Sequence, residues 1–299
     1  MTSTCTSSGR VPPSSCSAIR RSTASGSRAA RACNGATGRG SRSRNTAMDA
    51  ARSACYQGIT RSEHTVTQNP DDWKTHLRTI DWLDDVTDDE LDALPPGRSR
   101  SCTLGQVIFS PSPAYTSIFF CIEGLVRIHR LWPDGAEMTL GYVSPGQVFG
   151  EFGLFDRYPR ESYAMAATQC TVCELPIDAF RAVFDNHRLV AAAIAGQIAK
   201  RLKRVESRVA NLVFRDAFAR MCATLVELGE DFGNGGPAGV TVDVPLTQSE
   251  LATLVGTSRQ TVNAGLRKLE DAGVMGRSGQ RFVLLDTKRL IELGREGLD

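Results

Sequence analysis

Four side chains with planar hydrogen-bonding groups lie close together in the C-terminal third of the chain: Arg259, Gln260, Asn263 and Arg267. Guanidinium and amide groups form paired hydrogen bonds with base edges in a major groove. We expect Arg259 to contact guanine and Gln260 to favour adenine, because each side chain matches the donors and acceptors of that base. These residue types therefore predict a segment that reads the sequence of a DNA duplex.

The sequence around these side chains predicts two short helices joined by a tight turn. Thr247 and Glu250 form a T-x-x-E capping box at the start of the first helix, and Gly256 ends that helix. Thr257 and Ser258 offer an N-cap for the second helix. Such a pair places its second helix against base edges. The buried face of that helix is expected to carry Val262, Leu266 and Leu269.

A β-hairpin is predicted after the second helix. Gly273 ends the helix, and two apolar runs follow on either side of a Ser-Gly turn. Arg277 and Arg281 lie near the hairpin tip, where they suit phosphate groups. Capped helix pairs also occur in proteins that do not bind DNA, so a ligand-gated protein-binding module is an alternative. The five basic against two acidic residues between Thr257 and Phe282 favour DNA.

A second region, residues 71–187, has the pattern of a sensor domain built as a closed β-roll. A short helix is expected over Asp81–Leu94, after which the apolar residues alternate with a period of two. Pro145–Phe155 has glycines that let the backbone approach a ligand, with Glu151 between them. Short strands separated by Pro and Gly turns are typical of such rolls. The expected strands include Gln106–Phe109, Ser117–Ile122, Leu125–Leu131, Glu137–Val143 and a last one ending at Pro176.

A long helix is expected over residues 188–214, between these two regions. Its apolar residues recur at steps of three and four, which is a heptad pattern. A stripe this narrow fits a seam between the helices of two copies, and the alternative is a single helix packed inside its own domain. The predicted interface residues are Ala195, Ile198, Leu202, Val205, Val209 and Leu212.

Two motifs, in this order and at this spacing, resemble the Crp/Fnr family of bacterial transcription regulators. Gly150–Phe155 resembles the family's phosphate-binding cassette, and Thr257–Val262 resembles the start of its recognition helix. The resemblance covers about two thirds of the chain. It implies an α+β fold with an N-terminal double-stranded β-helix (jelly roll), a long dimerisation helix and a C-terminal winged helix-turn-helix over residues 215–299.

The resemblance also implies a function and partners. We expect a homodimeric, cytoplasmic regulator of transcription that binds double-stranded DNA at a palindromic operator and works with RNA polymerase. An enzyme is not expected, because Glu151 and Glu161 are the only paired carboxylates near a pocket and no nucleophile or metal set accompanies them. No membrane association is expected, since no apolar run approaches the roughly 18–20 residues that span a bilayer.

The family's cyclic-nucleotide pocket is matched only in part. Glu151 matches the family's ribose-binding glutamate, but Glu161-Ser162 stands where an Arg-Ser pair binds the cyclic phosphate, and Arg160 comes one residue early. On a strand a one-residue slip turns a side chain to the other face, so we expect cyclic AMP to bind weakly or not at all. The family's Thr-Ser pair that meets the purine corresponds to Glu206-Ser207. The candidate pocket residues are Gly150, Glu151, Phe152, Gly153, Arg160, Glu161, Ser162 and Ser207.

The sequence gives little support for a metal, iron–sulfur or haem cofactor. Cys170 and Cys173 form the only C-x-x-C, in a stretch that looks extended, where residues three apart point to opposite faces. They are expected to be buried, reduced thiols rather than a metal or redox site. Four further cysteines, at positions 5, 16, 33 and 55, are too widely spaced for an iron–sulfur cluster. The four histidines, at 64, 76, 129 and 187, are interpreted as ordinary side chains rather than haem ligands.

Residues 1–70 are predicted to be a basic extension. Residues 1–47 contain eight Arg and no acid, and they lack any periodic apolar pattern. The rest of the chain is acidic on balance. Three interpretations stay open: a non-functional or mis-assigned extension that precedes a true start at Met48, a nucleic-acid-binding arm, or a transit peptide.

Overall fold

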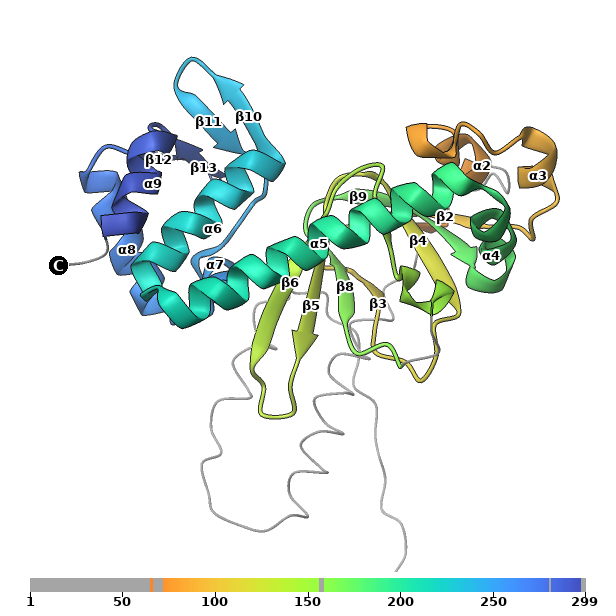
Figure 1. Cartoon of the computed structure of the whole chain (residues 1–299), viewed down its shortest axis with the longest axis horizontal. Helices are drawn as coiled ribbons and strands as arrows, with labels where there is room; N and C mark the ends of the chain where they lie inside the picture. The colour runs from red at the N-terminus through yellow and green to blue at the C-terminus, as the bar shows by residue number, and fades with distance from the viewer. Residues whose placement is uncertain (1–64, 67–71, 156–158, 280, 297–299) are drawn as a thin grey trace, which may run out of the picture. The chain divides into compact units, whose positions relative to one another are not determined.

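The structure, a computed structural model, describes residues 65–66, 72–155, 159–279 and 281–296 (Figure 1). The predictions for residues 1–47 lie outside the described residues. Strand β1 (Thr65–Val66) is the only element described before residue 72, and it pairs with strand β2 (Arg98–Cys102).

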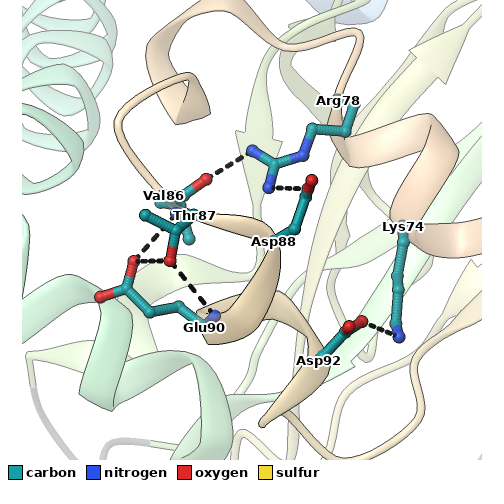
Figure 2. Close-up of polar contacts among 7 residues, drawn as sticks. All are labelled: Lys74, Arg78, Val86, Thr87, Asp88, Glu90 and Asp92. Atoms are coloured by element: carbon teal, nitrogen blue, oxygen red, sulfur yellow. Dashed lines mark hydrogen bonds and ion pairs between the residues drawn. The ribbon is translucent and has the colours of Figure 1, made fainter.

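Short helical segments precede the sheets: α2 (Asp72–Leu77), the 3₁₀ turn η2 (Asp81–Leu83) and α3 (Asp88–Asp92). The single helix predicted over Asp81–Leu94 is wrong, because Thr87 begins a new helix. Its side chain accepts a hydrogen bond from the Glu90 backbone N–H, while the Glu90 carboxylate accepts one from the Thr87 N–H at 2.9 Å (Figure 2). This capping box starts a separate helix, α3, at residue 88.

Two ion pairs tie α2 and its C-terminal end to α3 (Figure 2). Arg78 pairs with Asp88 and also donates to the Val86 carbonyl, each at 2.5 Å, and Lys74 pairs with Asp92. The apolar sides of these segments carry Trp73, Leu77 and Leu83, which are buried in one cluster with strand and helix residues of the roll. The segment therefore caps the roll rather than forming a separate unit.

Two antiparallel sheets form the roll. The first has the order β1-β2-β9-β4-β7 and the second the order β3-β8-β5-β6. Side chains from both sheets, such as Phe119, Val126 and Val172, share one buried cluster, so the sheets pack face to face. The predicted jelly roll is confirmed. The further strands are β3 (Val107–Phe109), β4 (Ser117–Glu123), β5 (Val126–Leu131), β6 (Glu137–Val143), β7 (Val148–Phe149), β8 (Tyr163–Ala166) and β9 (Cys170–Pro176).

Two consecutive helices follow the roll: α4 (Ile177–Asn186) and α5 (Arg188–Phe214). Helix α5 has the bounds that the heptad pattern predicted. Val190 and Ile194, in its first turns, are buried in the same cluster as Trp73 and Phe120. The N-terminal part of α5 is therefore anchored on the roll.

The C-terminal part combines helices and a four-stranded sheet around a second core that contains Leu225, Leu251, Leu266 and Phe282. The sheet order is β10-β11-β13-β12. The residues Gly233–Gly236, which are three glycines and one asparagine, form a strand that pairs with β11. The elements are α6 (Ala217–Phe232), β10 (Gly233–Gly236), β11 (Gly239–Val242), α7 (Gln248–Val255), α8 (Arg259–Asp271), β12 (Met275–Ser278), β13 (Arg281–Leu284) and α9 (Thr287–Glu296).

None of the helices among the described residues combines the length and the apolar character needed to cross a bilayer.

Candidate nucleic-acid interface and effector pocket

Helices α7 and α8 form the predicted helix-turn-helix, and local hydrogen bonds set its ends. Thr247 caps α7 through a complete capping box with Glu250. Gly256 ends α7 with a φ of 72°, a left-handed conformation that glycine adopts without strain. Ser258 caps α8 by accepting a hydrogen bond from the Thr261 N–H at 3.1 Å. The predicted caps are confirmed.

Helix α8 has one buried and one exposed face. Its buried residues include Val262, Leu266 and Leu269, as predicted. Thr257 is half-buried in the turn before the helix. Arg259, Gln260 and Arg267 are exposed, as is the cap residue Ser258.

Asn263 differs from the other polar residues of α8. It is half-buried, and its Oδ1 accepts a hydrogen bond from the Gln248 Nε2 at 3.1 Å. This contact joins α7 to α8, so Asn263 helps to set the angle between the two helices, while its amide N–H groups stay available to a ligand.

The wing is the hairpin of β12 and β13, and its two arginines meet acidic side chains. Arg277 Nε lies 2.7 Å from Glu270 Oε1, and Arg281 pairs with Asp243 at 3.2 Å. Both guanidinium groups stay substantially exposed, so these pairs are weak and can be exchanged. Together with Arg259, these two arginines line a concave surface between α7, α8 and the wing, which encloses a volume of about 490 Å³.

In the roll, Glu151 is the buried acid of the candidate pocket. Gly150, with a φ of 74°, turns the chain into the 3₁₀ turn η3 (Glu151–Leu154). Glu151 is 1 % exposed, and its Oε1 lies 2.5 Å from Arg201 Nη1 of α5. Arg201 also donates to the Val148 carbonyl. Burial raises the pKa of Glu151, and the Arg201 charge opposes that rise.

Arg160 lies inside the roll, contrary to the prediction from strand alternation. It is 6 % exposed, its guanidinium carbon lies 4.0 Å from the centre of the Phe109 ring, and its Nη2 donates to the Ser117 carbonyl at 2.9 Å. Its Nε is buried without a hydrogen-bond partner in the described part of the chain. Burial lowers the pKa of Arg160, and Glu151 opposes that shift. A Cβ added at Gly150 would lie 3.3 Å from Arg160 Nη2, so cation and cassette are neighbours.

Glu161 points to solvent rather than into the roll. Its side chain is 58 % exposed and pairs with Arg130 at 2.9 Å. The prediction that this carboxylate faces a bound phosphate is therefore wrong. Alternation applies only within a strand, and β8 does not begin until Tyr163; Arg160 itself makes only an isolated bridge to Ser112.

The remaining pocket predictions have mixed outcomes. Ser162 is half-buried just before β8, and Phe152 is exposed. Gly153 is buried against Tyr115, where a Cβ would come within 2.4 Å. Ser207 is exposed and lines a different cavity, between α5 and α6, so it is not next to Glu151 of the same chain.

Arg201 and the aromatic lining of Arg160 are the parts of the pocket that sequence reasoning missed. Arg201 could have been found only from the helical face that it shares with Val190 and Ile194. Phe109 and Tyr115 belong to no sequence motif, so nothing in the sequence marked them as neighbours of Arg160.

The described part of the chain leaves the apolar stripe of α5 about half uncovered. Leu202, Val205, Val209 and Leu212 are 47–57 % exposed, and Ala195 is also exposed. Ile198 alone packs partly against the roll cluster. A helix packed inside its own domain would bury this stripe, so that alternative is wrong for the C-terminal half of α5.

Comparison with known proteins assigns the roll and the C-terminal region each to a known domain family. Residues 99–187 match the model of the cyclic nucleotide-binding domain, and residues 219–293 match that of the Crp-like helix-turn-helix domain. A CRP-like cAMP-activated global transcriptional regulator of Mycobacterium tuberculosis is 33 % identical over 193 residues, which cover 64 % of this chain and 85 % of the relative. This chain belongs to the Crp/Fnr family.

Solved structures of Crp/Fnr regulators share the fold. A CRP/FNR family regulator from Thermus thermophilus is 30 % identical with a TM-score of 0.55, over 66 % of this chain and 98 % of that one. The c-di-GMP responsive regulator CLP of Xanthomonas campestris is 28 % identical with a TM-score of 0.55, over 63 % and 93 %. Members of the Crp/Fnr family are transcription regulators and not enzymes. In this chain, helices α7 and α8 form the family's DNA-binding helix-turn-helix.

Proposed function

We propose that this regulator is a homodimer that binds a palindromic operator under the control of a cyclic nucleotide. The observation that carries the DNA-binding proposal is the concave surface on which Arg259, Arg277 and Arg281 meet beside the exposed start of α8. Cations on such a surface suit the phosphates that flank a major groove, while α8 presents its planar groups to base edges. Arg277 and Arg281 would then exchange their acidic partners for phosphates.

Arg259 is the residue we assign to base recognition, and its replacement tests the proposal. Arg259→Ala should lose roughly 1–3 kcal/mol of discrimination for guanine. Gel-shift titration should show loss of specific binding, while sedimentation shows an unchanged oligomeric state. Unchanged operator affinity would instead favour the protein-binding module.

Gln260 should set a half-site that differs from that of the cyclic-AMP regulator. Gln260 replaces a Glu that is frequent in the family, and glutamine favours adenine where glutamate accepts from cytosine. Ala264 occupies a position where Arg is common. Selection of bound duplexes from a random pool should return a palindrome with altered positions, and recovery of that regulator's consensus would contradict this assignment.

The dimer proposal is based on the exposed stripe of Leu202, Val205, Val209 and Leu212. Four large apolar side chains at heptad spacing suit a two-helix seam, which also fixes the separation of the two α8 helices. A separation of about 34 Å between them would match two half-sites one DNA turn apart. RNA polymerase is the partner we propose for the DNA-bound form, on the family's precedent alone.

The roll has the charges that a cyclic nucleotide requires. Arg160 supplies a buried cation for the phosphate, and Glu151 supplies a carboxylate that can accept from a ribose hydroxyl. The expectation of weak cyclic AMP binding had two grounds: Glu161 in place of the phosphate-binding arginine, and Arg160 turned to the other face. The exposure of Glu161 and the burial of Arg160 inside the roll remove both. The names of the relatives point to more than one candidate effector for this chain, since one relative is named as cAMP-activated and another as c-di-GMP responsive.

Neighbouring residues provide a matched test of the pocket. Arg160→Gln should weaken cyclic nucleotide binding at least about tenfold, because a charged hydrogen bond of about 1.5–3 kcal/mol is lost. Glu161→Gln should leave the affinity unchanged. Calorimetry with cyclic AMP, cyclic GMP and cyclic di-GMP measures both variants. Tighter binding by Glu161→Gln together with unaffected binding by Arg160→Gln would reverse the assignment.

A further inference from the structure

Two cysteines from distant parts of the sequence face each other at one end of the roll. Cys102 ends β2 and Cys170 begins β9, and the two are directly paired in the antiparallel ladder. The Cα atoms of such pairs lie about 4.5–5.5 Å apart, within the range of about 4.4–6.8 Å that a disulfide spans. We propose that Cys102 and Cys170 are a modification site at which a hydroperoxide forms a reversible intrachain disulfide.

The pairing differs from the one that the sequence suggested. Cys170 and Cys173, the C-x-x-C pair, are both buried, but Cys170 belongs to the cluster inside the roll and Cys173 to the cluster under the helices. They point to opposite faces of β9, as predicted, and cannot bond to each other. The partner of Cys170 is set by strand register, which brings Cys102 across from it.

The backbone around Cys170 is held in place, so an opening of this end must come from the β2 side, which carries Cys102. Gly124 lies in the turn between β4 and β5 with a φ of 74°. A Cβ added there would lie 2.8 Å from Cys170 Cα, so this turn packs closely against the backbone of Cys170. Leu125 donates its N–H to Thr168 Oγ1 at 2.9 Å and accepts from the Ala167 N–H at 2.8 Å. The segment leading into β9 is therefore held by the turn between β4 and β5.

Electrostatics singles out Cys102 as the nucleophile. A hydrogen bond donated by the Cys170 thiol, with the Arg100 charge nearby, lowers the pKa of Cys102 to about 7, whereas the pKa of Cys170 is raised. Cys121, a third thiol in the same cluster, donates to the Glu123 and Gly124 carbonyls at 3.7 and 3.6 Å, and burial raises its pKa to about 12. Among these three thiols Cys102 is the one whose pKa is lowered, so we assign it as the nucleophile.

Access to the pair comes from its position at the end of the ladder. Cys102 and Cys170 are 1 % and 2 % exposed, but the turn that follows Cys102 is at the surface, with Leu104 70 % exposed. Ladder ends open locally at a much lower free energy than the whole fold. A small oxidant such as hydrogen peroxide can therefore reach Cys102 through brief opening of this end.

The chemistry balances in two steps. The Cys102 thiolate attacks one oxygen of hydrogen peroxide, which gives a sulfenic acid and hydroxide. The Cys170 thiol then attacks the sulfenic sulfur, forms the S–S bond and releases water. Overall two thiols lose two protons and two electrons, and one hydrogen peroxide becomes two waters. A dithiol such as dithiothreitol reverses the change.

The test is peptide mapping of the full-length chain by mass spectrometry. Reduced protein is treated with hydrogen peroxide in native buffer and, separately, refolded from urea in a glutathione redox buffer, so that slow access cannot hide the bond. Free thiols are alkylated before digestion with trypsin and chymotrypsin, and cleavage after Phe109 separates Cys102 from Cys121. A parallel sample carries Cys173→Ser, because Cys170 and Cys173 stay in one peptide.

The proposal expects one dominant product, a linked peptide pair that contains Cys102 and Cys170 and is abolished by dithiothreitol. Cys102→Ser and Cys170→Ser should both lose it, and Cys222→Ser, which removes a buried thiol of the C-terminal core, should retain it. Absence of the linked pair from both the native and the refolded sample would overturn the proposal. So would a bond from Cys102 to another cysteine as the main product.

Discussion

At the scale of single residues, His129 shows how an unpartnered buried group couples folding to pH. It lies on β5 with no exposed surface, and its ring stacks on Tyr163 at 5.3 Å between centroids. Neither ring nitrogen has a hydrogen-bond partner among the described residues. Burial, assisted by the positive charge of Arg127, lowers the pKa of His129 to about 4.

The pH dependence follows from the sign of this shift. An unfolded histidine takes up its proton near pH 6.5, above the pKa of folded His129, so acid favours the unfolded chain. The stability that the neutral ring contributes is complete above about pH 6.5 and is lost as the pH falls toward 4. Between pH 6.5 and 5 the loss should be about 2 kcal/mol. Urea unfolding at several pH values should show this step in the wild type, and His129→Phe should lack it; equal slopes would contradict the prediction.

Which side chains meet in the pocket could be predicted only in part. Glu151 and its flanking glycines were found because the cassette is a local motif. Arg160 was misplaced because its direction depends on where β8 begins, and that boundary is set by pairing with β3 and β5. Within one chain, α5 turns Ser207 away from Glu151 and presents Arg201 instead, so the place of Ser207 in a pocket stays a prediction.

At the scale of elements, α5 presents different sides to different neighbours. Val190, Ile194 and Arg201 face the roll, and Arg208 donates to the Leu140 carbonyl while it pairs with Glu227 of α6. The stripe residues Val205, Val209 and Leu212 border the same hollow as Leu140, yet they stay about half exposed. The heptad pattern revealed the stripe because its spacing is regular, but the contacts of the polar residues depend on tertiary packing.

One substitution tests the seam directly. Val209→Glu should convert the proposed dimer to a monomer, because it would place a charge on the apolar seam of both helices. Leu189→Glu is the matched control, since Leu189 is also exposed on α5 but lies outside the stripe. Sedimentation velocity distinguishes the two. A dimer that survives Val209→Glu would show that the stripe is not the interface.

The turn between α7 and α8 allows a second test at this scale. Gly256→Ala should cost about 1–2 kcal/mol, because φ is 72° and a side chain is strained there. Space is not the limit, since the nearest atom is Leu212 Cδ2 at 3.4 Å. Gly239→Ala should cost more, because its Cβ would lie 2.2 Å from the Leu284 carbonyl oxygen. Equal effects in urea unfolding would show that crowding is relieved at Gly239.

Local signals also explain which elements were predictable. The capping boxes at Thr87 and Thr247 are local to four residues, yet only the second was used to place a helix start. Strand β10 escaped prediction because Gly233–Gly236 offers no side-chain pattern, and its pairing with β11 exists only in the backbone.

At the scale of the whole molecule, the operator should mirror the two-fold symmetry of the proposed dimer. Adding about five base pairs between the half-sites turns one of them to the opposite side of the duplex. A dimer held by a continuous α5 seam cannot follow this rotation, so operator affinity should fall by at least about tenfold. Fluorescence anisotropy with the original and lengthened operators measures the change. Undiminished affinity would indicate that the two reading heads move independently.

The bridge from Arg201 to Glu151 has a consequence for how two bound effectors influence each other. In the proposed dimer, a nucleotide hydroxyl that engages Glu151 would compete with the guanidinium of Arg201, which lies on the helix proposed to join the two protomers. Filling one site would therefore disturb the backbone that both sites share, and the second molecule would bind to a half-loaded dimer already changed by the first. Titration curves should accordingly depart from a single hyperbola, and Arg201→Gln should bring them back toward one.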